Sequence, residues 1–238
     1  MHIETYPFAA AVTGKDLSGK TVVVIDVLRA TSVMVTALAN GAKAIVPLST
    51  LKGANRESRK YTSGNCLVCG ERNAQKTEGF DLGNSPLEFT RDIVEGKTLI
   101  MTTTNGTKAL NACRKAGEVY IGAFLNADAV VQQVKDEENL VLFCAGTNGK
   151  FSLDDGLCAG MIIDRLSRLI PIRLDDLGQL LLKLWRSSHG NITKTLADCS
   201  HLKYLIANGY EKDVSFCLQT DTHEIMPFYD PQRGIIDV

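Results

Sequence analysis

The chain has 238 residues, of which 45% are hydrophobic and 22% charged, and its formal net charge is −1. This composition predicts a water-soluble globular protein, and the near-neutral charge leaves no basic surface for nucleic acid. No apolar run approaches the ~20 residues of a membrane-spanning helix, and the first residues lack the basic and apolar regions of a signal peptide, so we expect no membrane partner.

The seven cysteines favour a reducing compartment. Their number is odd and most lie inside apolar segments, so we expect reduced thiols in a cytoplasmic protein. Cys66 and Cys69 form a CxxC pair, but no second pair follows at the spacing of a zinc site. Cys66 and Arg72 match the C-x5-R spacing of cysteine phosphatases. Because Glu71 would place a negative charge inside that anion-binding loop, we interpret Cys66 as a core thiol.

The clearest local pattern is a strand, loop and helix over residues 21–40. An unbroken β-branched run at 22–25 is typical of a strand buried on both faces, as in a parallel sheet. A helix with Thr31 or Ser32 as its cap is expected to follow and to end at a glycine. Residues 44–48 then predict a second strand, which completes a βαβ unit.

The remaining elements are predicted in the same way. We expect a helix within 49–65, a strand at 66–69, an ordered loop at 73–84, and a helix from Ser85 to residue 95 with Ser85 as cap, Pro86 at its first position and Glu88 behind it. Further helices are expected at 126–135, 154–169, 174–185 and 193–208, a strand at 140–144, and a β-hairpin at a sheet edge built from VSFCLQT and EIMPFY.

An internal repeat indicates the fold class. Gly19-Lys20-Thr21 followed by VVVID resembles Gly96-Lys97-Thr98 followed by LIMTT, and LVLFCAGTNG echoes LIMTTTNG. Repeated strand–loop–helix units predict a three-layer α/β/α fold with a mostly parallel sheet. Because no stretch of the sequence has the composition of a linker, we expect one domain over residues 1–238 with two internally similar halves and a C-terminal β-hairpin.

Asp26 and Arg29 follow the first buried strand. They fall at the carboxyl edge of the sheet, where open α/β folds bind their ligands. A carboxylate there can hold Mg²⁺, act as a nucleophile or orient water, and a guanidinium can clamp an oxyanion. The alternative is a local salt bridge without chemistry.

Three other groups are candidates for the same site. The run at 102–107 places hydroxyls and amides before a helix, which suits an anion or equally an elaborate helix cap, and it is no Walker A loop. Glu71 can ligate a metal and Arg72 can neutralise substrate charge, or either can form a surface ion pair. Asp154 and Asp155 can share Mg²⁺. Acidic residues are also common in the first turn of a helix, where they interact with the helix dipole, and we favour this second interpretation for Asp154.

Taken in order, these motifs resemble the 2-phosphosulfolactate phosphatase family, also called ComB. The motifs are Asp26-Val-Leu-Arg29-Ala-Thr31-Ser32, Gly70-Glu71-Arg72, Gly79-Phe80-Asp81-Leu82-Gly83-Asn84-Ser85-Pro86, Thr103-Thr104-Asn105-Gly106-Thr107 and Asp154-Asp155-Gly-Leu-Cys158-Ala-Gly160. The match runs from about residue 20 to residue 160, and Phe216–Asp221 extends it. Asp154 departs from the family pattern, in which glutamate is expected, and its reach toward a metal is shorter.

The resemblance implies a Mg²⁺-dependent phosphoric monoester hydrolase that forms a homodimer. It also implies an α/β fold that is particular to this family. Its reaction would convert (2R)-phosphosulfolactate to sulfolactate and phosphate, as in coenzyme M or related sulfolactate biosynthesis. The implied catalytic residues are Asp26, Arg29 and Glu71, the substrate-binding residues Arg29, Arg72, Thr103, Thr104, Asn105, Gly106 and Thr107, and the metal ligands Asp26, Glu71, Asp154 and Asp155. We prefer attack by water over an aspartyl phosphate on Asp26, because a D-x-D pair is absent.

Two other functions stay open. A non-catalytic sensor of a phosphorylated or sulfonated metabolite would also use Arg29 and the threonine loop, but clustered acids repel anions unless a metal intervenes. A dinucleotide-dependent oxidoreductase suits a doubly wound sheet, but the turn after the first strand lacks the GxGxxG glycines. We assign no role to His189, His201 and His223, which we place in peripheral segments.

Overall fold

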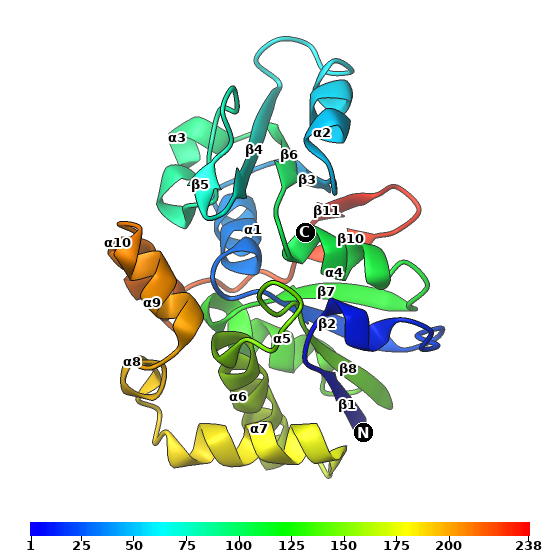
Figure 1. Cartoon of the computed structure of the whole chain (residues 1–238). Coiled ribbons are helices and arrows are strands. Elements are labelled where there is room, and N and C mark those ends of the chain that lie inside the picture. The colour runs from blue at the N-terminus through cyan, green and yellow to red at the C-terminus, as the bar shows by residue number, and fades with distance from the viewer.

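Eleven strands form one continuous mixed sheet in the computed structural model, which describes residues 1–238 (Figure 1). From edge to edge the strand order is β5-β4-β6-β3-β11-β10-β7-β2-β8-β1-β9. The strands are β1 (His2–Tyr6), β2 (Thr21–Ile25), β3 (Ala44–Pro47), β4 (Cys66–Arg72), β5 (Gln75–Lys76), β6 (Thr98–Thr102), β7 (Glu118–Gly122), β8 (Asn139–Cys144), β9 (Arg173–Leu174), β10 (Phe228–Asp230) and β11 (Ile235–Asp237).

Helices cover both faces of this sheet. They are α1 (Ala30–Ala39), α2 (Leu51–Ser58), α3 (Arg91–Val94), α4 (Gly106–Ala112), α5 (Ala127–Val134), α6 (Leu153–Leu169), α7 (Asp176–Ser187), α8 (Ile192–Thr195), α9 (Ser200–Ala207) and α10 (Glu211–Cys217), with short 3₁₀ turns at Ala9–Val12, Pro86–Glu88 and Phe124–Asn126. None of the helices combines the length and the apolar composition that crossing a bilayer requires.

Strand β2 is apolar at four of its five positions because it is covered on both faces. Val22 and Val24 point into a core that includes α1 and α4, whereas Val23 and Ile25 point into a second core that includes α5 and α6. All five residues of β2 are buried. Since successive side chains of a strand alternate between its faces, a strand covered on both sides is apolar on both, and only Thr21 at the start of β2 is polar. The predicted three-layer α/β/α arrangement is confirmed.

The sheet contains two sets of parallel strands, and β5 pairs antiparallel with β4 at one edge. One set is β9-β1-β8-β2-β7 and the other is β3-β6-β4. The hairpin β10–β11 lies between them and pairs antiparallel with β7 on one side and β3 on the other. Three successive antiparallel pairings reverse the strand direction, so the two sets run in opposite senses along the sheet.

The C-terminal hairpin is therefore in the middle of the sheet, and the prediction of an edge hairpin from VSFCLQT and EIMPFY is wrong. Most of VSFCLQT belongs to α10. Its buried residues Val214, Cys217 and Leu218 have the i, i+3, i+4 spacing of a helix face and pack into one core. Short apolar runs fit both periods, and here tertiary packing selects the helix.

Several helix boundaries also differ from the prediction. The helix expected from Ser85 is a 3₁₀ turn followed by the separate α3, because the Ser85 hydroxyl donates to Asp213 in place of capping. Thr31 and Ser32 lie inside the first turn of α1, whose N-cap is Arg29. The helix expected at 193–208 is divided into α8 and α9.

Candidate functional site

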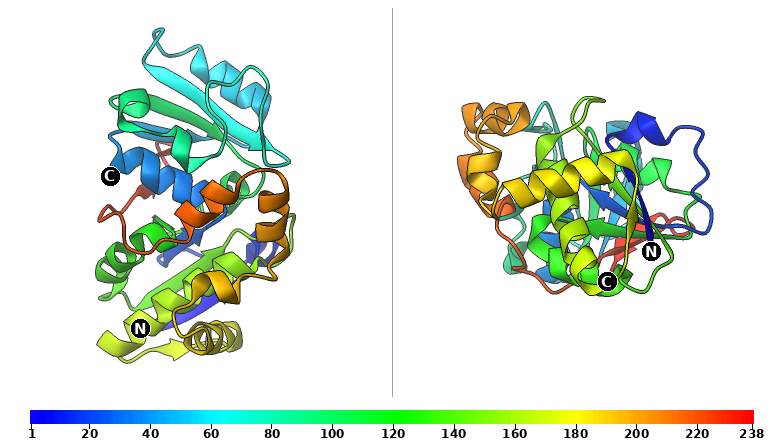
Figure 2. Two further views of the ribbon diagram at one scale, coloured as in Figure 1. Left: turned by 90° about the vertical axis from the view of Figure 1, so that its left-hand side faces the viewer. Right: turned by 90° about the horizontal axis from the view of Figure 1, so that it is seen from below.

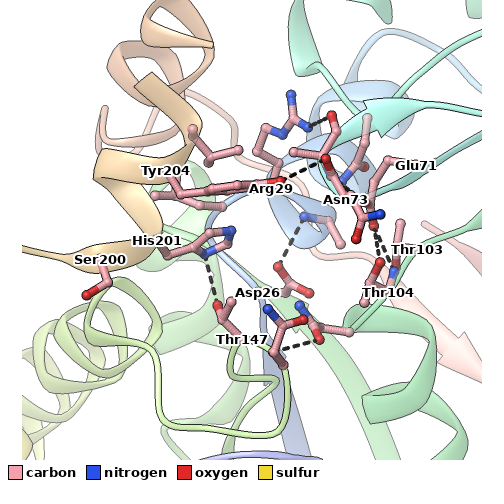
Figure 3. Close-up of a pocket in the computed structure, with 17 residues that line it drawn as sticks. Asp26, Arg29, Glu71, Asn73, Thr103, Thr104, Thr147, Ser200, His201 and Tyr204 are labelled. Atoms are coloured by element: carbon pink, nitrogen blue, oxygen red, sulfur yellow. Dashed lines mark hydrogen bonds between the residues drawn. The ribbon is translucent and has the colours of Figure 1, made fainter. Parts of the chain in front are cut away.

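A polar pocket of about 260 Å³ opens at the carboxyl ends of β2 and β6 (Figure 3). Seventeen residues line it, from the segments after β2, β6 and β8, the start of α1, the end of β4 with the β4–β5 turn, the loop that contains Asn84, and α9. Figures 1 and 2 show α9 and α10, in orange, at the height where the two strand sets meet. Of the predicted site residues the pocket brings together Asp26, Arg29, Glu71, Thr103, Thr104 and Asn105, whereas Arg72, Gly106, Thr107, Asp154 and Asp155 do not line it.

Asp26 is fixed by the turn between β2 and α1. Its backbone N–H donates to Thr31 Oγ1 (3.0 Å), and its Oδ1 accepts from the Ala30 N–H (3.3 Å). The side chain is buried, and burial together with the charge of Asp154 raises the pKa of Asp26 to about 7. Oδ2 accepts no hydrogen bond from the protein, so one carboxylate oxygen remains available at the pocket.

This raised pKa predicts how stability depends on pH in the metal-free protein. The unfolded chain loses the Asp26 proton near the ordinary pKa of 3.8, but the folded protein keeps it until about pH 7. The free energy of unfolding contributed by Asp26 is therefore fully present below pH 3.8 and is lost as the pH rises to about 7. Urea denaturation in EDTA across this range should show a decline that is smaller in Asp26→Asn. An equal decline in both proteins would contradict the assignment.

Arg29 lines the pocket, and three groups hold its guanidinium in place. Its Nη1 donates to Asp213 Oδ2 (2.6 Å), its Nη2 donates to the Ala74 carbonyl (2.8 Å), and the Tyr210 ring centroid lies 4.0 Å from its Cζ. These bonds use two of the five guanidinium N–H groups. No protein group accepts from the other three N–H groups, and Arg29 lines the pocket, so they are the candidates for binding an oxyanion. Asp213 offsets the cost of burying the cation.

Glu71 joins two walls of the pocket. Its Oε1 accepts from both the N–H and the hydroxyl of Thr104 (2.8 Å each), and its Oε2 accepts from the Ala74 N–H (2.9 Å). It thereby ties the β4–β5 turn to the segment after β6. Its neighbour Arg72 turns away and donates to Thr102 Oγ1 (2.9 Å) and to backbone carbonyls.

Gly106 begins α4 beside Asp26. A Cβ added there would lie 2.8 Å from the Ala30 Cβ, 3.1 Å from Asp26 Oδ2 and 3.4 Å from Thr103 Oγ1. The absence of a side chain at position 106 thus lets the helix end approach the carboxylate. The neighbouring Thr107 is buried and donates to the Thr103 carbonyl.

Gly106→Ala should therefore displace the Asp26 carboxylate. We expect overpacking to cost about 1–3 kcal/mol of unfolding free energy and activity to fall at least about tenfold. Gly53→Ala in α2 is a matched control, because its Cβ would meet only the Thr50 hydroxyl (2.9 Å), far from the pocket in the fold. Phosphate-release kinetics and thermal melting should separate the two variants, and equal activities would show that the packing at residue 106 is irrelevant to the site.

The two acids at the start of α6 have different environments. Asp155 accepts from the N–H groups of Val27 (2.9 Å) and Gly146 (3.0 Å), and so ties the segments after β2 and β8 together. Asp154 Oδ1 accepts from the Ser152 hydroxyl, whereas its Oδ2 is buried without any hydrogen-bond partner. An unsatisfied buried carboxylate oxygen is costly, which indicates a missing partner beside Asp154.

The predicted metal ligands fit Mg²⁺ in part. Asp26 and Asp154 each keep one oxygen free of protein donors, and the charge of Asp154 acts on Asp26. The oxygens of Glu71 and Asp155 are held by N–H or O–H donors. No three His, Cys, Asp or Glu side chains are grouped so as to hold a metal ion. Two carboxylates suffice for Mg²⁺, which usually completes its shell with water and substrate oxygens.

Sequence reasoning missed much of the far wall. The pocket is also lined by Asn84, which belongs to one of the family motifs, and by the unpredicted residues Asn73, Thr147, Asn148, Ser200, His201 and Tyr204. Thr147-Asn148-Gly149 repeats the Thr104-Asn105-Gly106 motif, which was the available signal for that segment. The peripheral placement of His201 is wrong, because the Tyr204 hydroxyl donates to the Asn73 carbonyl (3.0 Å) and holds α9 against the β4–β5 turn. No local sequence pattern predicts this contact between residues far apart in the chain.

Comparison with known proteins agrees with these features. The family model for 2-phosphosulpholactate phosphatase matches residues 8–232. A probable 2-phosphosulfolactate phosphatase of Caldanaerobacter subterraneus subsp. tengcongensis is 44% identical over 228 residues, 95% of each chain. Proteins of the same name from Thermotoga petrophila (45% identical, 87% of this chain and 88% of the relative) and Clostridium botulinum strain Eklund 17B (36% identical, 99% of each chain) match similarly.

Fold and pocket together define an α/β protein with an enzyme-like site, in which a buried carboxylate and a buried arginine face one polar cavity. The chain belongs to the 2-phosphosulpholactate phosphatase family. The resemblance seen in the sequence motifs is thereby confirmed. The relatives bear the name of a phosphoric monoester hydrolase.

Proposed function

We propose that this protein is a Mg²⁺-dependent phosphatase that hydrolyses (2R)-phosphosulfolactate to sulfolactate and phosphate. The observation that carries the proposal is the convergence of Asp26, Arg29 and the 103–105 loop on one pocket in a member of this family. We further propose that the reaction serves coenzyme M or related sulfolactate biosynthesis, in a cytoplasmic homodimer.

The lining of the pocket suits this substrate. Phosphosulfolactate carries phosphate, sulfonate and carboxylate groups, which need positive charge and hydrogen-bond donors. Arg29 supplies a cation, and four asparagines supply carboxamides: Asn73, Asn84, Asn105 and Asn148. Neutral amide donors suit a sulfonate, because they satisfy its oxygens without the desolvation cost of further buried cations.

Asp26 and Asp154 would hold the Mg²⁺. When bound, the ion would polarise the phosphoryl group and offset the repulsion between substrate and carboxylates. The free N–H groups of Arg29 would donate to phosphoryl oxygens as negative charge develops on them. Attack by water is preferred over attack by Asp26, in line with the absent D-x-D pair.

A substrate panel tests the proposal. Phosphate release should be measured with racemic 2-phosphosulfolactate, phosphoglycolate and p-nitrophenyl phosphate in the presence of Mg²⁺. We expect kcat/KM to be at least about tenfold higher for the sulfonate than for phosphoglycolate. Tight binding of phosphosulfolactate without phosphate release would favour the sensor, and equal rates with all three substrates would contradict the proposed specificity.

A further inference from the structure

A chain of hydrogen bonds leads from Asp154 to the far wall of the pocket. The Ser152 hydroxyl lies 2.5 Å from Asp154 Oδ1, Thr147 Oγ1 lies 3.1 Å from Ser152 Oγ, and His201 Nδ1 lies 2.9 Å from Thr147 Oγ1. Figure 3 shows the last of these bonds between the segment after β8 and α9. The three bonds connect a buried carboxylate to an imidazole that lines the cavity.

The direction of this chain follows from its first member. The Ser152 hydroxyl donates its single proton to Asp154 Oδ1. Ser152 Oγ can then only accept from Thr147, and the Thr147 proton is used in that bond. Thr147 Oγ1 must therefore accept from His201, which places the imidazole proton on Nδ1.

Two further observations favour a proton on Nδ1. In the metal-free protein the unpartnered Asp154 Oδ2 lies 3.9 Å from His201 Nδ1, so a proton on that nitrogen is nearer to the carboxylate than one on Nε2. In the neutral ring one nitrogen carries the proton and the other a lone pair, and no protein acceptor pairs with Nε2, as a proton there would require. No protein donor reaches Nε2.

We propose that the Asp154–Ser152–Thr147–His201 chain holds His201 as its Nδ1–H tautomer, and that Nε2 orients the water that attacks the phosphoryl group. The second half of this proposal rests on the proposed function. Every polar group of ionised phosphosulfolactate is an acceptor, so a bare lone pair in the pocket has no partner on the substrate. Water is the only reactant that can donate to it. Ser152 and Thr147 are then positioning residues.

The tautomer can be observed directly. The chain has four histidines, so long-range ¹H–¹⁵N correlation spectra of histidine-labelled protein should resolve His201, assigned by its absence in His201→Gln. At pH about 8, where imidazole is neutral, we expect a protonated Nδ1 and a bare Nε2. Thr147→Val should increase the Nε2–H form, and Thr147→Ser, which keeps the hydroxyl, should retain the Nδ1–H form. An Nε2–H tautomer in the unaltered protein, or no change in Thr147→Val, would overturn the assignment.

Kinetics test the role of Nε2. His201→Ala should lower kcat by about 10²-fold with little change in KM, because the substrate does not bind to Nε2. His201→Gln, which keeps a polar atom near the Nε2 position, should recover more activity than His201→Asn. An unchanged kcat in His201→Ala would refute the water-orienting role. If the unaltered protein shows the Nδ1–H tautomer but releases no phosphate, the proposed function fails while the tautomer assignment stands.

Discussion

Asp26→Asn should reduce kcat/KM for phosphate release by at least about 10²-fold, since one buried charged group that acts on the reacting centre is worth that much or more. Asparagine has the same shape, so the bonds of the turn around residue 26 can be kept. It lacks the charge that would help to hold Mg²⁺ and the free anionic oxygen that the pocket presents. Steady-state kinetics with 2-phosphosulfolactate measure this loss.

Asp164→Asn is the matched control. Asp164 is as deeply buried as Asp26, but it lies on α6 outside the pocket, where Arg168 and Arg186 pair with it. We expect this variant to lose stability and to keep kcat/KM within about threefold, because its partners are far from any substrate. Near-normal activity in Asp26→Asn would contradict both mechanisms that use this carboxylate: attack by water with its help, and formation of an aspartyl phosphate on Asp26.

Arg29→Met should give the largest loss of stability. It removes the partner of Asp213, whose side chain is 6% exposed in its ion pair with Arg29. Breaking a buried pair in this way costs about 3–5 kcal/mol of unfolding free energy, because the remaining charge is left uncompensated. It also removes the stacking on Tyr210 and the bond to the Ala74 carbonyl. Urea denaturation provides the measurement.

The double variant Arg29→Met/Asp213→Asn separates stability from function. Removal of the second charge should restore part of the lost stability. It should restore no activity if Arg29 also contacts the substrate, because the cation is still missing. Recovery of both stability and kcat/KM in the double variant would show that Arg29 serves only as the partner of Asp213.

The parallel parts of the fold could be predicted because their signals are local. The β-branched run of β2, the glycine after α1 and the repeat at β6 each follow from a few neighbouring residues. The position of the C-terminal hairpin could not be predicted. Strand β10 makes only one residue pair with β7, and β11 makes only one with β3. Nothing in their composition indicates the middle of a sheet.

The candidate site also contains residues that local sequence patterns predict and residues that they do not. Asp26 and Arg29 follow β2 and were predictable from the carboxyl-edge rule. The 103–105 loop follows β6, whose strand set runs in the opposite sense, so the rule does not predict that it joins the same pocket. The pairing of Arg29 with Asp213 and the approach of His201 to Thr147 join residues far apart in the chain, so neither follows from local pattern. Glu71 was predicted as a metal ligand, but its two carboxylate oxygens accept from Thr104 and Ala74, so its observed contacts join two walls of the pocket.

The most direct test of the central claim is phosphate release from 2-phosphosulfolactate by metal-stripped protein, before and after addition of Mg²⁺. The account predicts no release in EDTA, full release once Mg²⁺ is in excess, and none from Asp26→Asn under either condition. Release at the same rate in EDTA, or no release even with Mg²⁺, would contradict a Mg²⁺-dependent phosphatase in this pocket.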